Sequence, residues 1–187
     1  MKAKLSLSSV VPSLGFKVTH KDMTLPSIRM FRDARYGYVF DFDVFLESKG
    51  FNLQREFCWS LKQKQELILT LLKGGVVPQV AVVNFEDKHD VFMVIDGKQR
   101  LGAILDFYDG KFPISVGGID YFYEDLDADA QRCVWNFSAQ GQVAYSYPLS
   151  KGGPLISDDS LINWFYLLNF TGTAQDEEHL NKLMKNI

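Results

Sequence analysis

The sequence has few residues of the types that build metal and nuclease centres, and it has no long apolar run. Two cysteines, Cys58 and Cys133, and three histidines occur in 187 residues. They do not show the Cys/His spacing of a zinc site, and the scattered histidines do not form an HNH-type nuclease centre. No apolar run approaches the roughly 20 residues that a membrane-spanning helix requires. These absences argue against a zinc protein, an HNH centre and a membrane anchor.

An excess of positive charge is absent as well. The chain has 20 Lys and Arg residues against 23 Asp and Glu residues, which gives a formal net charge of −3. This balance lacks the basic footprint of a DNA-binding domain, although it permits a local basic patch. The sequence also has no Walker A loop, no Gly-x-Ser-x-Gly nucleophile elbow and no internal repeat. It therefore belongs neither to the P-loop nucleotidases nor to the α/β-hydrolases.

The residues that are present suffice for a folded domain. Hydrophobic residues make up 47% and aromatic residues 14% of the 187 residues, a usual length for one domain. The first residues, Met1 to Lys4 and a serine-rich segment, do not resemble a secretory signal. The two cysteines lie in apolar surroundings, so we expect buried thiols in a reducing compartment. We therefore expect a soluble, cytoplasmic protein that forms a single domain over residues 1–187.

Hydrophobic periodicity predicts a mixture of strands and helices. Residues 1–30, which proline and glycine interrupt, are expected to be irregular. A capping box of Ser60 and Gln63 predicts the start of a helix that ends before Gly74. The other expected elements are strands at 38–46, 79–85, 91–95 and 142–149, extended structure with a bend at 111–123, a charged turn at 86–90, and helices at 97–108, 127–138, 158–168 and from about 175. The expected core beside the central corner is Trp59, Leu67, Leu71, Ile95, Leu101, Ile104 and Leu105.

Two aspartates lie in the first expected strand. Asp41 and Asp43 alternate with Phe40, Phe42 and Val44, so the two side-chain types point to opposite faces. Two carboxylates at this spacing can bind a metal ion, but no third ligand with a suitable spacing follows them. A solvated strand face is the simpler interpretation.

The most informative segment is a strand-to-helix corner with the sequence Asp96-Gly97-Lys98-Gln99-Arg100. Asp96 is predicted to cap the helix, with Gln99 as its reciprocal partner. Gly97 permits a tight turn and a close approach of a ligand to the backbone. Lys98 and Arg100 place two cations where the free N–H groups and the helix dipole already favour an anion. The corner is therefore a candidate phosphate site.

The same corner also has a purely structural interpretation. Asp-Gly is common at the start of a helix, and short motifs match by chance. Two positive charges in a first helical turn oppose the helix dipole. Arg100 therefore needs an anionic partner, which is either a ligand or Asp96 itself.

Three segments together carry a resemblance to a known family. The first is Gln54-Arg55 followed by Trp59 and the helix after Ser60, the second is the Asp96–Arg100 corner, and the third is Phe165 to Asn169 followed by Gly172-Thr173. In this order they resemble the Asp-Gly-Gln-Gln-Arg (DGQQR) family, the N-terminal domain of GmrSD-type restriction enzymes. The resemblance covers roughly residues 40 to 185. It implies an α+β, ParB/sulfiredoxin-like fold, a mixed sheet with surrounding helices.

The resemblance also implies a function. Members of this family bind nucleoside triphosphates, and some hydrolyse them to gate the restriction of phage DNA. The implied ligand is GTP or ATP with Mg²⁺, and the implied partners are DNA and a separate nuclease subunit in a bacterial or phage-infected cell. The catalytic residues would be Asp96, Gln99 and Arg100. The phosphate-binding residues would be Arg55, Gly97, Lys98, Arg100, Asn169, Gly172 and Thr173.

The sequence departs from the family at two points. Lys98 stands where the family has glutamine, which adds a charge to the pocket. We also expect a stand-alone domain, without the C-terminal HNH nuclease domain of full-length relatives.

Three functions remain open. They are a slow nucleoside triphosphatase linked to restriction or its evasion, a ParB-like DNA nuclease or nickase that uses the same pocket, and a non-catalytic interaction module. The intact polar residues disfavour the third, and the net negative charge disfavours the second.

Overall fold

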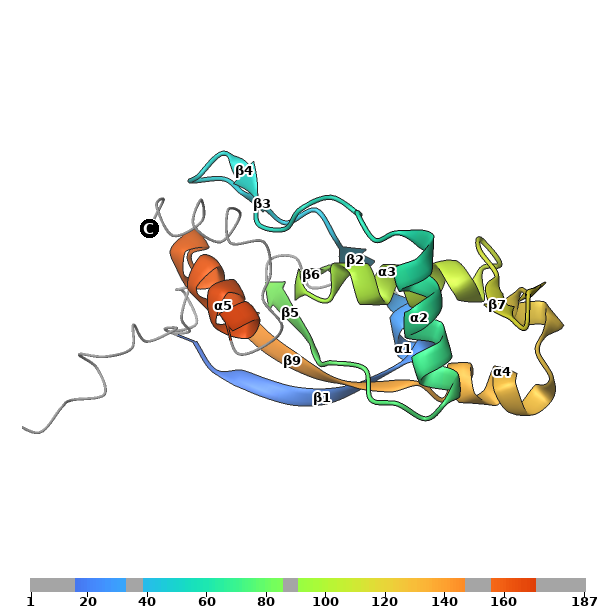
Figure 1. Ribbon diagram of the computed structural model, residues 1–187. Helices are drawn as coiled ribbons and strands as arrows, with labels where there is room; N and C mark the ends of the chain where they lie inside the picture. The colour runs from blue at the N-terminus through green and yellow to red at the C-terminus, as the bar shows by residue number, and fades with distance from the viewer. Residues whose placement is uncertain (1–15, 33–38, 86–90, 147–155, 171–187) are drawn as a thin grey trace, which may run out of the picture.

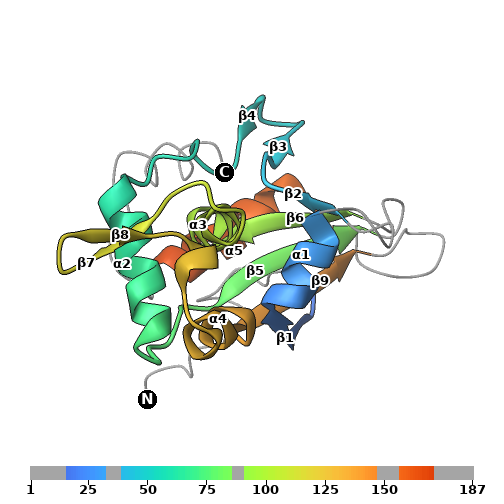
Figure 2. The same cartoon turned by 90° about the vertical axis from the view of Figure 1, so that its right-hand side faces the viewer.

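A mixed five-stranded sheet organises the fold (Figure 1, Figure 2). The computed structural model describes residues 16–32, 39–85, 91–146 and 156–170. The strands of this sheet are β1 (Val18–Thr24), β2 (Val39–Asp41), β5 (Val80–Phe85), β6 (Val91–Asp96) and β9 (Ser138–Ser146). Their order across the sheet is β1-β9-β5-β6-β2. The β1–β9 and β5–β6 pairs are antiparallel, and the β5–β9 and β2–β6 pairs are parallel.

Helices cover both faces of the sheet. They are α1 (Leu25–Arg32), α2 (Leu61–Leu72), α3 (Lys98–Tyr108), α4 (Ala128–Trp135) and α5 (Asp158–Phe170). In Figure 1, α5 lies to the left of the sheet, and the other four helices lie to its right. Two small hairpins, β3 (Phe45–Leu46) with β4 (Phe51–Asn52) and β7 (Ile114–Val116) with β8 (Ile119–Tyr121), and a short 3-10 helix, η3 (Tyr123–Asp125), complete the described elements.

The central strand β5 explains this layered arrangement. Val80 and Val82 pack into the core formed with α1 to α4, whereas Ala81 and Val83 pack into the core formed with α5. Successive side chains of a strand point to opposite faces, so a strand between two helical layers is apolar throughout. The neighbouring strand β6 ends at Asp96 between these two cores, and the polar corner therefore opens at the junction of the layers.

Many of the predicted elements are confirmed, as is the α+β class. Helix α2 begins with the predicted capping box, in which Ser60 accepts from the N–H of Gln63 and the Gln63 side chain accepts from the N–H of Ser60. The predicted bend is the β7–β8 turn, where Gly117 and Gly118 both have positive φ. The helix predicted at 127–138 is α4, which begins after its N-cap Asp127 and ends at Trp135. The finer likeness to the ParB/sulfiredoxin fold stays a prediction.

The interpretation of residues 1–30 as irregular was wrong for the described part of that range. Strand β1 pairs with β9, and α1 follows it directly. Thr24 and Ser27 make the helix start, because the Thr24 N–H donates to Ser27 Oγ at 3.0 Å and the Ser27 N–H donates to Thr24 Oγ1 at 3.4 Å. Pro26 lies in the first turn of α1, where its missing N–H has no helical partner to lose.

The single strand predicted at 38–46 is broken. The N–H of Asp43 donates to Asp41 Oδ1 at 2.9 Å, and this local bond turns the chain out of β2. The last strand begins at Ser138, earlier than predicted, and α5 continues to Phe170. The predicted turn at 86–90 and the predicted helix from about 175 lie outside the described residues.

The expected burial is correct for the aliphatic side chains of the core and wrong for the two thiols. Five side chains of the expected core are buried, and Trp59 and Leu67 are half-buried. Cys58 and Cys133 are both exposed, the first in the loop before α2 and the second on the outer face of α4. In the described part of the chain, every helix is too short or too polar to cross a membrane.

Candidate functional site

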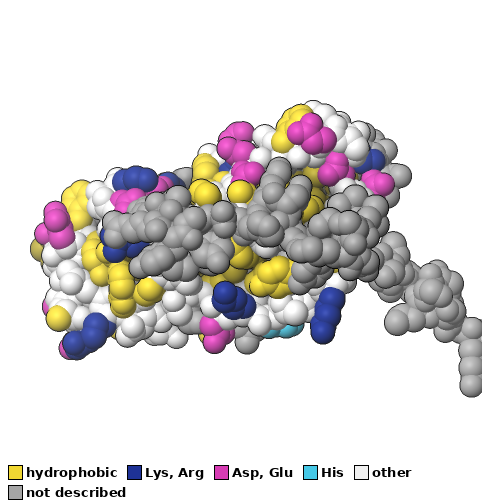
Figure 3. All heavy atoms as spheres, turned by 180° about the vertical axis from the view of Figure 1, so that it is seen from behind, with side chains coloured by type: hydrophobic (Ala, Val, Ile, Leu, Met, Phe, Trp, Pro, Cys, Tyr) yellow, Lys and Arg dark blue, Asp and Glu magenta, His cyan; other side chains and the backbone are white. Residues whose placement is uncertain are grey.

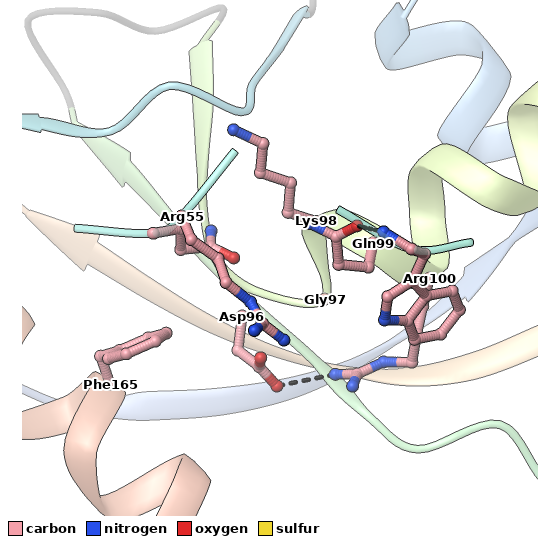
Figure 4. Close-up of a pocket in the computed structure, with 9 residues that line it drawn as sticks. Arg55, Asp96, Gly97, Lys98, Gln99, Arg100 and Phe165 are labelled. Atoms are coloured by element: carbon pink, nitrogen blue, oxygen red, sulfur yellow. Dashed lines mark hydrogen bonds and ion pairs between the residues drawn. The ribbon is translucent and has the colours of Figure 1, made fainter. Parts of the chain in front are cut away.

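A small, open pocket lies where β6 ends and α3 begins (Figure 4). Its lining comes from the loop before α2, from the β6–α3 corner and from α5. The lining residues are Gln54, Arg55, Trp59, Asp96, Gly97, Lys98, Gln99, Arg100 and Phe165. The three segments that carry the family resemblance are therefore adjacent in the fold, although more than 100 residues separate Gln54 from Phe165.

An ion pair forms one wall of this pocket. Arg100 Nη2 lies 2.7 Å from Asp96 Oδ2, and the two side chains are only 18% and 15% exposed. The same nitrogen donates to the carbonyl oxygen of Gln79 at 2.9 Å. Within the described residues, Nε of Arg100 is the buried side-chain donor that lacks a hydrogen-bond partner. A buried charged donor without an acceptor is costly, so this position favours an additional acceptor.

The prediction that Asp96 caps α3 was wrong. The N-cap is Gly97, whose φ is 103°, and no side chain caps the helix. Asp96 instead pairs with Arg100 one turn later, because a guanidinium offers a carboxylate a stronger, charge-assisted bond than a backbone N–H does. Of the two partners considered for Arg100 from the sequence, the intramolecular one is therefore present. The first-turn N–H groups of α3 remain without a side-chain cap.

Gly97 is required by the geometry of the corner. A Cβ atom at this position would lie 2.5 Å from Cγ1 of Val80, and the backbone is in the left-handed region. The predicted role of this glycine, a tight turn, is confirmed.

Arg55 brings a second cation to the pocket from the loop before α2. Its side chain extends toward the Asp96 carboxylate (Figure 4). Within the described part of the chain, the Arg55 guanidinium makes no hydrogen bond or ion pair. The neighbouring Gln54 is fixed, because its amide nitrogen donates to the carbonyl oxygen of Val94. Arg55 is thus an available cation on an anchored loop.

Gln99 lies at the pocket but its side chain is occupied. Its Oε1 accepts from the N–H groups of Cys58 at 3.1 Å and Trp59 at 3.2 Å. Its Nε2 donates to the carbonyl oxygen of Glu56 at 2.9 Å. The side chain of Gln99 therefore holds the loop before α2 against the start of α3.

Lys98 is buried and its ammonium group faces away from the Asp96–Arg100 pair (Figure 4). Only 2% of its side chain is exposed, and Nζ lies 2.8 Å from Asp43 Oδ1. Nζ also lies 3.9 Å from a carboxylate oxygen of Glu56 and 4.9 Å from the centre of the Phe57 ring. Asp43 is solvated as expected, with 70% of its side chain exposed, but it lies beyond the end of β2 and pairs with Lys98.

The remaining predicted site residues lie in or beyond α5. Asn169 is buried and donates to the carbonyl oxygen of Phe165 at 2.7 Å, and it is not part of the pocket lining. Gly172 and Thr173 lie outside the described residues. Three residues of the lining, Gln54, Trp59 and Phe165, were not among the predicted site residues. All three belong to the segments that carry the resemblance, so the signal for them was present in the sequence.

The donor set of the pocket is poor in acidic residues. Among the described residues, Asp96 is the one carboxylate in its lining. No group of three or more His, Cys, Asp or Glu side chains suited to a metal ion occurs within the described ranges. Figure 3 shows the molecule from behind the view of Figure 1. On this face the visible Lys and Arg side chains of the described residues occur in separate groups rather than in one large patch.

The sequence model described as "GmrSD restriction endonuclease, N-terminal domain" matches residues 52–186. Comparison with curated proteins and with solved structures gives no match. The matched segment contains every residue of the pocket lining.

Proposed function

The chain belongs to the family of GmrSD restriction endonuclease N-terminal domains, and from this premise we propose that its pocket binds a nucleoside triphosphate and hydrolyses it slowly. Membership relates the chain to restriction endonucleases. The proposed role is to gate the restriction of phage DNA, or its evasion, according to the nucleotide that is bound. GTP and ATP are the proposed ligands, and DNA and a separate nuclease subunit are the proposed partners.

One observation carries this proposal: two arginines of the pocket, Arg55 and Arg100, have guanidinium N–H groups that bind no acceptor among the described residues. Arg55 makes no hydrogen bond or ion pair within the described ranges, and Arg100 has an unsatisfied Nε. Guanidinium groups bind phosphate oxygens through two parallel hydrogen bonds. The uncapped N-terminus of α3 adds the positive end of the helix dipole to the same place. These groups together suit a polyphosphate better than they suit a neutral ligand.

The proposed reaction uses the Asp96–Arg100 pair as a switch. A phosphate that enters the pocket competes with Asp96 for the guanidinium of Arg100. The carboxylate that is displaced can then orient a water molecule for attack on the terminal phosphate, while Arg55 and Arg100 neutralise the developing charge. Gln99, whose two polar atoms hold the loop, contributes by keeping Arg55 in place.

The lining fits a magnesium ion that arrives with the nucleotide. Mg²⁺ usually keeps several waters and takes only one or two carboxylates besides the phosphates of the substrate. Asp96 would supply that carboxylate. When bound, the ion would add charge neutralisation at the phosphates.

A titration with ATP, GTP and CTP, each with and without Mg²⁺, tests the proposal. We expect saturable binding of at least one triphosphate and weaker binding of the matching monophosphate, because the phosphates provide the contacts. Equal affinity for a nucleoside and its triphosphate would contradict the phosphate role of the pocket. Failure to bind any nucleotide would reject the proposed function.

The name of the family supports a second candidate, which is DNA cleavage in the same pocket. In this alternative, Asp96, Arg55 and Arg100 would act on a phosphodiester. The net charge of −3 and the separate basic groups in Figure 3 disfavour extended contact with duplex DNA. A nicking assay on supercoiled plasmid without nucleotide distinguishes this function from the first.

A further inference from the structure

We propose that Lys98, Gln99 and Gly102 of α3 are positioning residues that dock the segment Gln54–Trp59, called here the Arg55 loop, and thereby aim Arg55 into the pocket. Lys98 then acts on the ligand through this loop and not by contact with phosphate. The part of the proposal that concerns affinity rests on the proposed nucleotide function. The part that concerns docking of the loop does not.

The first contact comes from Lys98. Its ammonium group lies within 2.8 Å of Asp43, 3.9 Å of Glu56 and 4.9 Å of the Phe57 ring centre. A buried ammonium needs such partners, since an uncompensated buried charge is strongly unfavourable. Two of the three partners belong to the Arg55 loop. Lys98 thus fastens the middle of the loop to the first turn of α3.

The second contact comes from Gln99. It accepts from the N–H groups of Cys58 and Trp59 and donates to the carbonyl oxygen of Glu56. These three bonds bind the backbone of the loop, so they fix its path whatever its side chains are. A glutamine at this position is matched to the loop by both of its polar atoms.

The third contact comes from Gly102, one turn after Lys98. A Cβ atom here would lie 2.4 Å from Cε1 and 3.1 Å from Cζ of Phe57. The Phe57 ring therefore packs directly on the backbone of α3, and it also touches the Phe42 ring at a centroid distance of 5.8 Å. Glycine lowers helix propensity by about 1 kcal/mol relative to alanine, so its presence in mid-helix requires a reason such as this close packing.

All three contacts are made to the Arg55 loop, which carries the Arg55 guanidinium group. Arg55 is exposed and has no hydrogen bond or ion pair within the described ranges, so the position of the loop backbone sets the region that its guanidinium group can reach. The Lys98 ammonium is already surrounded by its own partners and faces away from the Asp96–Arg100 pair. A lysine that replaced the family's glutamine as a phosphate ligand would instead face the pocket.

Amide hydrogen exchange at Cys58 and Trp59 measures docking directly, because both amides donate to Gln99. Lys98→Met keeps the apolar stem and removes the charge. Gly102→Ala favours the helix but collides with Phe57. Both variants retain Gln99, and we expect each to speed exchange at Cys58 and Trp59 by about three- to ten-fold and to weaken triphosphate binding by a similar factor. Amides in the middle of α2, which neither substitution alters, should exchange at unchanged rates.

The matched control is Lys111→Met. Lys111 also forms an ion pair, at 2.8 Å with Asp106, but it lies just beyond the opposite end of α3. We expect this variant to leave exchange in the Arg55 loop and the affinity unchanged. A double-mutant cycle adds a second control: in a Phe57→Ala background the collision is removed, so Gly102→Ala should change exchange by less than about two-fold.

Two results would overturn the inference. One is unchanged exchange of the Cys58 and Trp59 amides in both variants. The other is a loss of affinity in Lys98→Met with exchange unchanged, which would make Lys98 a direct ligand of the phosphates. If Lys98→Met fails to fold, Gly102→Ala decides the question. If the wild type binds no nucleotide, the proposed function fails, while the exchange rates still decide whether these residues dock the loop.

Discussion

The guanidinium of Arg100 and the carboxylate of Asp96 lie 2.7 Å apart. Asp96 precedes the N-cap residue Gly97, and Arg100 lies in the first turn of α3. Each is mostly buried, and each is a group that a phosphate-binding site uses: the first to hold an anion, the second to orient water. Their pairing keeps the charge of the pocket balanced in the absence of a ligand. Under the proposed function, a ligand with greater negative charge than one carboxylate would displace Asp96, and the pocket would therefore prefer polyphosphates.

The first prediction concerns this arginine. Arg100→Ala should weaken nucleotide binding by about ten- to a hundred-fold, since a charge-assisted bond in a partly desolvated site contributes roughly 1.5–3 kcal/mol. Isothermal titration of the variant against the wild type provides the measurement. Arg132→Ala, which removes an exposed arginine paired with Asp129 on α4, is the control and should bind like the wild type. Equal losses in both variants would mean that overall charge, not the site, governs affinity.

A second prediction concerns the core under the site. Leu105 is 3% exposed and packs in the core formed with α1 to α4. Leu105→Ala should lower the free energy of unfolding by about 2–5 kcal/mol, the usual range for a buried leucine. Urea denaturation measures this change. A loss below about half a kcal/mol would show that the inner face of α3 is assigned incorrectly.

Local signals explain which parts of the fold and site could be predicted. Four residues, from Ser60 to Gln63, contain the signal for the start of α2. Five residues, from Asp96 to Arg100, contain the signal for the strand-to-helix corner. The start of α1 was missed because a strand leads straight into it and Pro26 was interpreted as a breaker, although a first-turn proline is compatible with a helix. Local patterns of this kind carry no information about which residues meet across the fold.

The contacts that shape the site join residues that are far apart in the sequence. Lys98 and Asp43 are separated by 55 residues, and Gln99 and Cys58 by 41. No spacing rule connects such positions, so the sequence could not predict that Lys98 pairs with Asp43 or that Gln99 binds the backbone at Cys58. The family resemblance predicted that the segments are neighbours. The directions of the side chains depend on packing that only the structure displays.

A third prediction uses the pH dependence of stability. Burial of Asp106 raises the pKa of its carboxyl group, but hydrogen bonds and charges from Lys111 and Lys64 outweigh burial and hold the pKa below its ordinary value of 3.8. A lowered folded-state pKa stabilises the fold above the unfolded pKa, and this contribution is lost as pH falls through the folded value. Asp106→Asn should therefore be less stable than the wild type at pH 7, with the difference shrinking below about pH 3.8.

Urea denaturation of both proteins over a range of pH measures this difference. Asp120→Asn, at an exposed position of β8, is the control and should follow the wild type at each pH. A difference between Asp106→Asn and the wild type that stays constant into acid would show that the variant acts through packing and not through charge.

A fourth prediction concerns Gly97. Gly97→Ala should lower the free energy of unfolding by about 1–3 kcal/mol, because the new Cβ meets the Val80 side chain and the left-handed backbone is strained. Gly110→Ala is the matched control, since its φ is also positive, at 68°, but nothing lies within 4 Å of the new Cβ. We expect the Gly97 variant to lose more stability than the control. Equal losses would mean that strain alone, and not contact with β5, makes this glycine necessary.

The last prediction separates binding from turnover at Asp96. Measured without Mg²⁺, Asp96→Ala should spare or tighten nucleotide binding, because it removes a negative charge near the phosphates and releases Arg100. With Mg²⁺ present, it should lower any rate of hydrolysis. The variant leaves the mostly buried guanidinium without its carboxylate, so its stability must be measured first by denaturation and the affinity corrected for the folded fraction. Asp96→Asn, which keeps the shape of the side chain, is the milder comparison. If Asp96→Ala binds more weakly than the wild type after this correction, Asp96 is a ligand contact and not the competitor of the phosphate. If the wild type binds no nucleotide but nicks plasmid DNA, and Asp96→Ala abolishes nicking, the pocket is a nuclease centre and the triphosphatase proposal is wrong.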